Sequence, residues 1–411
     1  KSCKLCFSEA LNIELSLNDQ CVSHHFTTDE EVKTHTQHLE VGQCGNCGLV
    51  QTTSPFPVDE LTPNYSWITC TEPEGHLDAL VADLRTFKEV DSSSSIVGLS
   101  FKEETTLARF NALNYSNTRI LNPLNDFEIE NANSKIELVQ HRFTHERANK
   151  LREKYGEARI FIARHILEHA YNLVDFVSAS LALVAVGGYV VFEIPDCETG
   201  LVNGDPTILW EEHTVCFTEA TFKRLFEVMG LTIVYFKKIH YKYENAFVAV
   251  IEKQSENTLM KQPHHFGDVK NDMELYQAFV RRFDQNKKKI IDTLISWQAL
   301  GKKVAFIGAG HMANSFINYY DIGKYIDFVI DDNEQMQNLH MPRCKNKIVS
   351  SKCIKAGLVD IILSSISELG EKKLKEKHGA YLDELDFMSI YSQDRDSIYR
   401  YVYLQHEKLE G

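Results

Sequence analysis

Hydrophobic positions in the first two thirds of the chain alternate between helical and strand spacing. Helical spacing of apolar residues predicts helices at 76–88, 105–114, 148–155, 174–183 and 219–229, and short apolar runs predict strands at 95–99, 118–121, 158–163 and 188–194. The segment 188–194 is almost wholly apolar, as expected of a strand that is buried on both faces of a parallel sheet. The alternation of strand and helix predicts a doubly wound α/β domain.

The rest of the chain predicts a second unit of the same class. Segments 232–239 and 246–251 are expected to pair antiparallel at the edge of the first sheet, and the polar stretch 252–272 is typical of a linker. Segment 273–300 has the spacing of a long amphipathic helix. Strands are then predicted at 303–307, 326–330 and 360–364, with a helix at 314–320.

The chain is long enough to require several cores. Its first 75 residues are rich in Thr, Ser, His and Cys with little periodicity, which is typical of a small module held together by a metal. At 411 residues we expect a metal-binding module at 1–75, an α/β domain at 76–255, and a long helix with a Rossmann-like domain at 256–411. The predicted fold class is therefore α/β, with two doubly wound domains and a small N-terminal module.

Two C-x-x-C pairs, Cys3/Cys6 and Cys44/Cys47, indicate the metal. Each pair can place two thiolates on one turn, and two such turns can close a tetrahedron around Zn²⁺. The glycines and asparagine in Cys44-Gly-Asn-Cys-Gly48 suit such a turn, although four unrelated buried thiols are the alternative. Because a four-sulfur site leaves no coordination position open, its expected role is structural.

Composition excludes some classes of partner. A net charge of −14 argues against nucleic acid or an anionic membrane as the main partner, since either requires a basic face. No apolar run reaches the length of a membrane span, and no signal peptide is visible, although the chain opens on Lys1. Ten cysteines, four of them in metal-type spacing, suit a reducing compartment, so we expect a cytoplasmic protein.

The order of these parts resembles the sugar C-methyltransferase family. The segments that carry the resemblance are Cys44-Gly-Asn-Cys-Gly-Leu-Val-Gln51, Ala163-Arg-His-Ile-Leu-Glu-His169, Phe192-Glu-Ile-Pro195 and Glu212-His-Thr-Val-Cys-Phe-Thr218. That family places a methyl group on a nucleotide-linked keto-deoxysugar and takes it from S-adenosylmethionine (SAM). The resemblance implies a SAM-methyltransferase-like domain at 76–255, a nucleotide-linked sugar as substrate, and one-carbon transfer as the reaction.

C-methylation beside a ketone requires removal of a weakly acidic proton, and histidine is the natural base near neutral pH. The resemblance implies this role for His213, with Glu212 as an orienting or substrate-contacting partner. The family pattern Tyr-x-Glu-His is matched except that Trp210 replaces its tyrosine. Together with Trp210, the family places aromatic residues on the substrate side of the site at Tyr65 and Trp67.

The expected cofactor-binding turns depart from the family pattern. The residues at the cofactor-binding positions are Gly98, Ser100, Asn122 and His165. Ser100 and Glu104 stand where glycines are expected and narrow the approach to the backbone, and the amide of Asn122 replaces a carboxylate that would bind ribose. His165 and His169 fit either a cofactor wall or a satisfied core. SAM remains the expected cofactor, but these replacements favour an alternative in which the fold binds a sugar nucleotide or a partner without methyl transfer.

A glycine turn in the C-terminal unit admits a further alternative. Gly308-x-Gly310-x-x-Ala313 follows a predicted strand, and Asp331-Asp332 ends the next strand. This context suits a dinucleotide, with phosphate at a helix N-terminus and ribose on the acid, so an NAD(P)-dependent sugar-nucleotide oxidoreductase is a possible function. The resemblance instead implies that Gly308 and Gly310 help to enclose the sugar nucleotide, without NAD.

Overall fold

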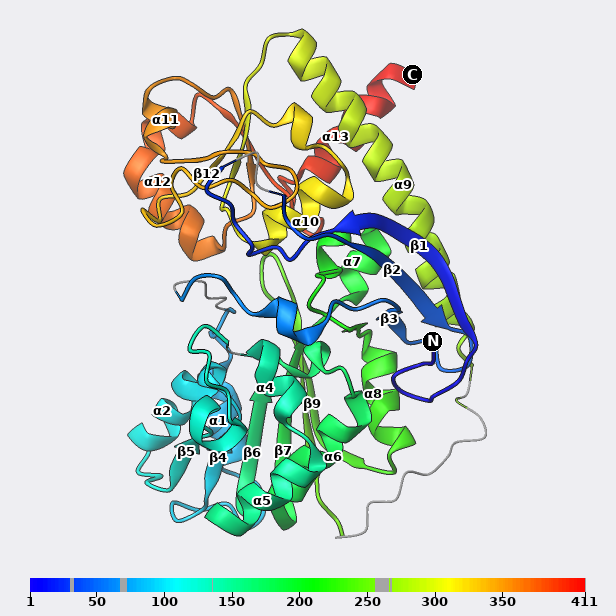
Figure 1. Cartoon of the computed structure of the whole chain (residues 1–411), viewed down its shortest axis with the longest axis vertical. Helices are drawn as coiled ribbons and strands as arrows, with labels where there is room; N and C mark the ends of the chain where they lie inside the picture. Colours follow the sequence, from blue (N-terminus) through cyan, green and yellow to red (C-terminus); the bar gives the residue numbers. More distant parts are fainter. Residues whose placement is uncertain (30–32, 67–71, 135, 256–265, 267, 411) are drawn as a thin grey trace.

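The structure is a computed structural model of the chain, and it describes residues 1–29, 33–66, 72–134, 136–255, 266 and 268–410. Two α/β units follow each other along the long axis, and a β-ribbon and one long helix run beside their junction (Figure 1). The lower unit in that view comes from the middle of the chain and the upper unit from its C-terminal part. The predicted α/β fold class is confirmed, whereas the limits of the three expected domains stay predictions.

The sheet of the middle unit has the strand order β5-β4-β6-β7-β10-β9. Its strands are β4 (Ile96–Gly98), β5 (Thr118–Ile120), β6 (Ala158–Arg164), β7 (Val184–Pro195), β9 (Thr232–Ile239) and β10 (Ala246–Glu252). Strands β4 to β7 are parallel, and β10 pairs antiparallel with both β7 and β9. The predicted antiparallel pair is therefore confirmed, with β9 at the edge and β10 inside the sheet.

Helices bury both faces of this sheet, as the alternation along β6 shows. Ile160 and Ile162 pack with α1 (Leu77–Leu84) and α2 (Glu104–Ala112). Phe161 and Ala163 belong to the cluster on the opposite face. The helices of that second face are α4 (Ile136–Arg142), α5 (His145–Tyr155), α6 (Leu173–Leu183) and α8 (Glu219–Val228). Burial on both faces explains why the strands are continuously apolar.

Polar caps fix where several of these helices begin. The hydroxyl of Thr144 accepts the N–H of Arg147 at the start of α5, and the hydroxyl of Thr218 accepts the N–H of Thr221 at the start of α8. Each cap satisfies a backbone donor that has no partner within its helix. Short 3₁₀ turns complete the connections at Val58–Leu61, Phe101–Glu103, Leu167–His169, Pro206–Ile208 and Gly323–Tyr325.

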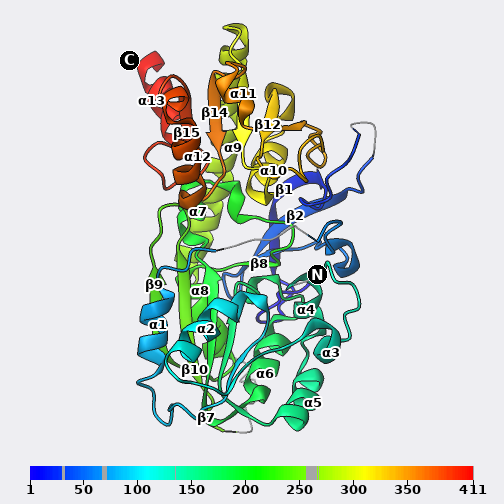
Figure 2. The same ribbon diagram turned by 90° about the vertical axis from the view of Figure 1, so that its left-hand side faces the viewer.

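The sheet of the C-terminal unit is parallel throughout, with the strand order β13-β12-β11-β14-β15. Its strands are β11 (Val304–Ile307), β12 (Phe328–Ile330), β13 (Ile348–Val349), β14 (Ile361–Ser364) and β15 (Asp386–Ser389). Its helices are α10 (His311–Tyr319), α11 (Lys352–Lys355), α12 (Glu368–Leu382) and α13 (Ile398–Glu410). This sheet lies above the sheet of the middle unit in the side view (Figure 2).

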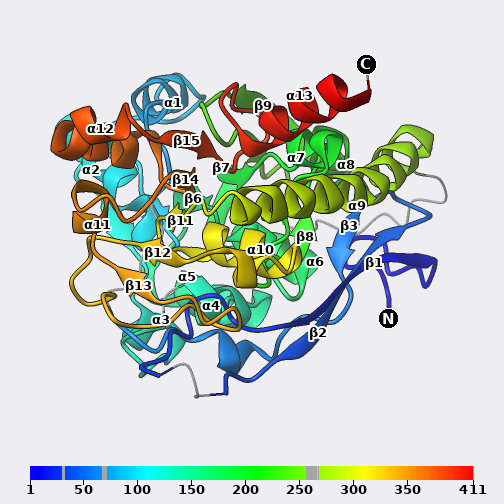
Figure 3. The ribbon, with the colours of Figure 1, turned by 90° about the horizontal axis from the view of Figure 1, so that it is seen from above.

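One long helix, α9 (Lys270–Ala299), spans the junction between the units and matches the helix predicted at 273–300. Its buried positions, including Tyr276, Phe283 and Trp297, follow helical spacing. Helix α13 runs beside it (Figure 3), and the ring centroids of Trp297 and Tyr401 are 5.5 Å apart. Among the described residues, no helix has both the length and the apolar character needed to cross a bilayer.

The N-terminal part forms a sheet that the sequence analysis did not predict, with the order β1-β2-β3-β8. Its strands are β1 (Leu11–Gln20), β2 (Gln37–Cys44), β3 (Val50–Thr52) and β8 (Val215–Cys216). Strand β8 belongs to the middle unit and begins two residues after His213. The sheet therefore holds the predicted catalytic segment directly against the cysteine-containing part of the chain.

A close contact between α7 (Glu198–Asn203) and α9 yields the first prediction. Gly204 ends α7 with φ +71°, and a Cβ added there would lie 2.5 Å from the Cβ of Arg282. Gly204→Ala should therefore destabilise the protein by about 1 kcal/mol through left-handed strain and by about 1–3 kcal/mol more through overpacking. Urea unfolding of wild type and variant measures the loss.

Gly301→Ala is the matched control, because Gly301 has φ +74° and nothing within 4 Å of an added Cβ. This variant should show the backbone strain alone. Equal losses of stability in the two variants would show that the packing of α7 on α9 is not tight at Gly204.

Candidate active site

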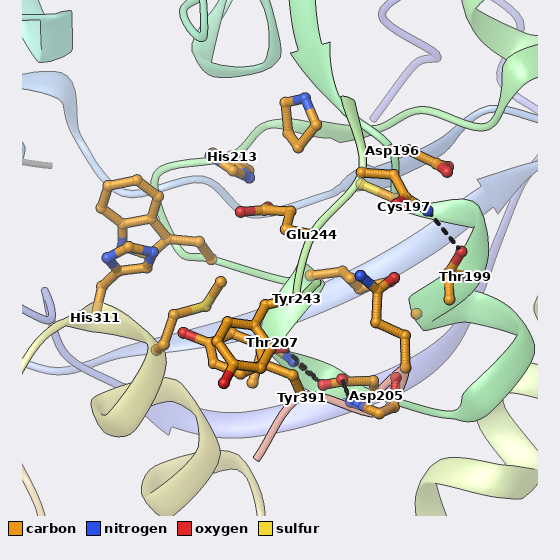
Figure 4. Close-up of a pocket in the computed structure, with 18 residues that line it drawn as sticks. Asp196, Cys197, Thr199, Asp205, Thr207, His213, Tyr243, Glu244, His311 and Tyr391 are labelled. Carbon is orange, nitrogen blue, oxygen red and sulfur yellow. Dashed lines mark hydrogen bonds between the residues drawn. The ribbon is translucent and has the colours of Figure 1, made fainter. Parts of the chain in front are cut away.

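A cavity lies between the two α/β units, at the carboxyl ends of β7 and β15 and beside the β9–β10 loop. Its enclosed volume is about 50 Å³, within a wider space of about 580 Å³ that opens to solvent. The middle unit contributes Asp196, Cys197, Thr199, Asp205, Trp210, His213 and Glu244, and the C-terminal unit contributes His311, Met312, Tyr391, Ser392 and Gln393. His213 and His311 lie on one side of it, and Asp196, Cys197 and Thr199 lie on the other (Figure 4).

Trp210 connects the two units at this cavity. Its ring stacks on the imidazole of His311, with centroids 4.1 Å apart and planes at 21°. The rings of His213 and Trp210 are 5.0 Å apart in an edge-on arrangement. Trp210 therefore lies beside His213, and His311 joins them from the first turn of α10.

The backbone around His213 is fixed on both sides. Its N–H donates to the carbonyl of Trp210 at 2.9 Å, and its carbonyl accepts the hydroxyl of Thr52, on β3, at 3.0 Å. The next residue, Thr214, donates its N–H to the carbonyl of Glu168 at 2.8 Å. The half-buried imidazole is therefore held at the cavity wall by strand β3 and by the 3₁₀ turn Leu167–His169.

Burial lowers the pKa of His213 from its usual 6.5 to about 3, and the nearby His311 and His165 act in the same direction. The imidazole is therefore neutral at physiological pH, which is the state that a proton acceptor needs. His169 lies edge-on against it with ring centroids 4.7 Å apart, and burial lowers its pKa as well.

The carboxyl group of Glu212 is buried and lies beside two other histidines. One oxygen lies 3.0 Å from Nε2 of His24, and the other lies 3.7 Å from Nδ1 of His169. Burial raises the pKa of this carboxyl well above its usual value, and Glu137 and Glu211 raise it further. The geometry thus relates Glu212 to His213 through the ring of His169, so its expected role as a direct partner stays a prediction.

The sequence analysis did not assign Glu168, Glu244 or His311 to the site. Glu168 brings a ligand-type atom within 4.8 Å of such atoms of His169 and His213. It is buried, and burial raises its pKa to about 7. Glu244 and His311 line the cavity. For Glu168 and His311 a signal existed, because one precedes a flagged histidine and the other follows the glycine turn directly.

The predicted cofactor residues gather at the carboxyl ends of β4, β5 and β6. Gly98 ends β4, and the hydroxyl of Ser100 accepts the N–H of Lys102 at 3.2 Å. Asn122 caps α3 (Pro123–Phe127) by accepting the N–H of Asn125 at 2.9 Å. Both replacements in the family pattern are thus engaged in local turns.

His165 follows β6 with a left-handed φ of +48°, which aims its ring at Glu193 on β7. Its Nε2 lies 3.1 Å from the Glu193 carboxylate, whose other oxygen accepts Nε of Arg164 at 2.6 Å. Burial disfavours the charged imidazole, but Glu72 and Glu193 outweigh burial and raise the pKa of His165. His165 is therefore part of a buried ion network behind the cavity.

The remaining predicted substrate residues differ in placement. Tyr65 packs against the apolar cluster that includes the C-terminal sheet, and Trp67 lies outside the described residues. Gly308 has φ +94°, and an added Cβ would lie 2.7 Å from both Ile366 and Ser365. A Cβ added to Gly310, which caps α10, would meet nothing within 4 Å. Gly308 is thus required by packing, and Gly310 leaves the start of α10 open.

The acids after β12 are directed at the protein itself. Asp331 accepts the N–H of Ala309, in the glycine turn, at 3.0 Å. Asp332 accepts from Ser351 and Lys377, at 2.7 Å in each case. Both carboxylates thus already accept hydrogen bonds from the protein, and Asp332 stays exposed.

The four paired cysteines converge as a metal site requires. Sγ of Cys3 lies 3.4 Å from that of Cys47, and Sγ of Cys6 lies 3.6 Å from that of Cys44. All four sulfurs lie within 4.8 Å of one another. A tetrahedral zinc with bonds of about 2.3 Å sets its sulfurs about 3.8 Å apart, so the cluster fits Zn²⁺.

Comparison with known proteins identifies one part of the chain. Residues 252–365 match the family model described as C-methyltransferase C-terminal domain. A search of curated proteins gives no match. A SAM-dependent methyltransferase structure from Anabaena variabilis is 13% identical, with 44% of this chain and 86% of that chain covered and a TM-score of 0.28.

A second solved structure, 1,6-didemethyltoxoflavin-N1-methyltransferase from Burkholderia thailandensis, is 9% identical. The alignment covers 44% of this chain and 78% of that chain, with a TM-score of 0.29. At such scores the structural likenesses carry no inference about this chain, and we rely on the family match.

The cysteine cluster yields the second prediction. Cys44→Ser should lose the bound zinc and lower the melting temperature, because Cys44 packs in the same apolar cluster as the sheet of the middle unit. Metal content by mass spectrometry and thermal unfolding measure both effects. Cys353→Ser, at a buried cysteine of the C-terminal unit, is the control and should keep its zinc. A full zinc content in Cys44→Ser would refute the assignment.

Proposed function

We propose that the whole protein methylates a carbon of a nucleotide-linked keto-deoxysugar, with SAM as donor and His213 as base, because residues 252–365 match the model of a C-methyltransferase C-terminal domain. The observation that carries this proposal is the shared cavity. It brings a neutral imidazole from the middle unit together with the first turn of α10, which lies inside the matched domain. His213 and the matched domain therefore border the same cavity.

His213 is suited to remove the proton beside a ketone. Its imidazole is neutral, and its ring faces the cavity beside Trp210 and His311. A pKa of about 3 makes the resting imidazole a weak base, so proton transfer requires that negative charge develops beside it. An enolate forming within the cavity supplies that charge, and the resulting imidazolium stabilises it.

The cavity also suits the two ends of a nucleotide-linked sugar. The carboxyl group of Glu244, in the loop between β9 and β10, offers hydrogen bonds to sugar hydroxyls. At the C-terminal side, α10 begins at Gly310 with no side-chain cap, and its next residues His311 and Met312 line the cavity. The amino end of a helix favours anions, so we place the diphosphate there.

A methionine carboxylate fits the donors at the ends of β4 and β6. The backbone N–H groups of Ser100 and Arg164 both donate there to the carboxylate of Glu103. The two donors are therefore spaced to bind a carboxylate. Ser100 and Arg164 would hold the carboxylate of SAM, and bound SAM supplies an electrophilic methyl group.

The engagement of Glu103 in that corner also favours a second candidate, a methyltransferase-fold protein that binds a sugar nucleotide without methyl transfer. Calorimetric titration with SAM, S-adenosylhomocysteine and NADH separates the candidates. Binding of the first two supports methyl transfer. Binding of neither would favour the second candidate, and binding of NADH alone would favour the oxidoreductase.

The proposed base yields the third prediction. His213→Asn should lower turnover of a nucleotide-linked keto-deoxysugar by about 10²–10⁴-fold, because an amide cannot accept the proton. Methyl transfer from labelled SAM measures turnover, and calorimetry measures the affinity for S-adenosylhomocysteine, which should stay within about twofold because no binding interaction is removed. The control is His145→Asn on the exposed start of α5, with turnover near wild type. Unchanged turnover in His213→Asn would remove the residue from this role.

A further inference from the structure

Glu103 is a fully buried carboxylate in the corner where the cofactor is proposed to bind. It ends the 3₁₀ turn Phe101–Glu103 before α2, and its side chain folds back over the end of β4. A Cβ added to Gly98 would lie 2.6 Å from the Cβ of Glu103. The bare backbone of Gly98 is therefore covered by the stem of this glutamate.

The carboxylate of Glu103 bridges two neighbouring parallel strands. One oxygen accepts the N–H of Ser100 at 2.6 Å and the hydroxyl of Ser100 at 3.2 Å. The other oxygen accepts the N–H of Arg164, at the end of β6, at 2.7 Å. Strands β4 and β6 pair directly, with Gly98 opposite Ile162. These bonds thus occupy the outward donors of both strand ends.

Helix capping explains only one part of this arrangement. A capping box accounts for the bond from the Ser100 N–H to Glu103 and for the bond from Lys102 to the Ser100 hydroxyl. It does not require the second oxygen of Glu103 to reach a separate strand. A capping box also does not require the carboxylate to be wholly buried. Burial of a carboxylate is energetically costly unless donors pair with it. The bridge to Arg164 therefore needs another explanation.

We propose that Glu103 is an internal ligand of the cofactor corner, which takes the donors that the methionine carboxylate of SAM requires and must be displaced before SAM binds. The proposal rests on the function proposed above. It makes Glu103 a determinant of cofactor affinity, because a ligand that competes with a side chain of the protein binds only the fraction of molecules in which the side chain is withdrawn.

The surroundings of Glu103 allow this displacement. Burial raises the pKa of its carboxyl to about 7, although the N–H groups of Arg164 and Ser100 act in the opposite direction. Near neutral pH a part of the carboxyl population is protonated, and a neutral carboxyl is held less firmly by N–H donors than a carboxylate is.

Binding of S-adenosylhomocysteine to the full zinc-loaded chain tests the proposal by calorimetry. Glu103→Ala should bind this probe about tenfold or more tightly than wild type, because the competing carboxylate is gone. Glu146→Ala is the matched control. It removes the same charge at an exposed position in the first turn of α5 and should bind like wild type.

Added acetate supplies a second readout. It should weaken binding of the probe to Glu103→Ala by refilling the corner, and it should leave wild-type binding unchanged. If the alanine variant does not fold, Glu103→Gln replaces it, and it should bind the probe more tightly than wild type by a smaller factor because its amide oxygen still accepts one N–H.

The outcomes separate this inference from the proposed function. Equal and measurable affinity in wild type, Glu103→Ala and Glu103→Gln would overturn the role of Glu103 while leaving SAM as the donor. Absence of binding in all of them would overturn both this role and SAM-dependent methyl transfer. A gain in Glu146→Ala equal to that in Glu103→Ala would show a general charge effect and would also overturn the inference.

Discussion

The candidate site depends on the contact by which the middle unit meets the C-terminal unit. The ring of Trp210 stacks on His311, and the buried carboxylate of Asp205 accepts the N–H of Ser392 at 3.0 Å. Tyr243 stacks on Tyr391 across the same junction, with ring centroids 4.5 Å apart. These contacts close the space above the carboxyl ends of the middle sheet, so that an otherwise open edge becomes a cavity. The low pKa of the imidazole in its wall follows from that closure.

The elements of both α/β units could largely be predicted from hydrophobic spacing, because strands buried on two faces and helices with one apolar face leave clear periods. The N-terminal sheet could not. In β1 only Leu15, Leu17 and Gln20 are buried, and the cover for this face comes from α9 and the C-terminal unit, far away in sequence. Strand β8 is too short to show a hydrophobic period, and its two residues are held in place by pairing with β3.

The sequence indicates which residue types lie in the segments of the candidate site, but it does not show where their side chains point. The position of His213 beside Trp210 follows from the motif, but the carboxylate of Glu212 is directed to His24 because adjacent residues of an irregular segment diverge. In the turn after β4, the sequence shows that Ser100 replaces a glycine, but it does not reveal the contacts of Glu103. The replacement of a glycine can be read from the sequence. The hydrogen bond from a neighbouring strand to a glutamate side chain depends on the folded structure, so the sequence does not show it.

The central claim is that the cavity between the two units holds a keto-sugar against an imidazole that takes its proton. The most direct measurement is deuterium uptake from D₂O at the carbon beside the ketone. It uses a panel of nucleotide-linked keto-deoxysugars, with S-adenosylhomocysteine in place of the methyl donor. The account predicts enzyme-dependent uptake at that carbon for at least one sugar. Methyl transfer to a sugar that shows no uptake at that carbon, or transfer to an oxygen instead of carbon, would contradict it.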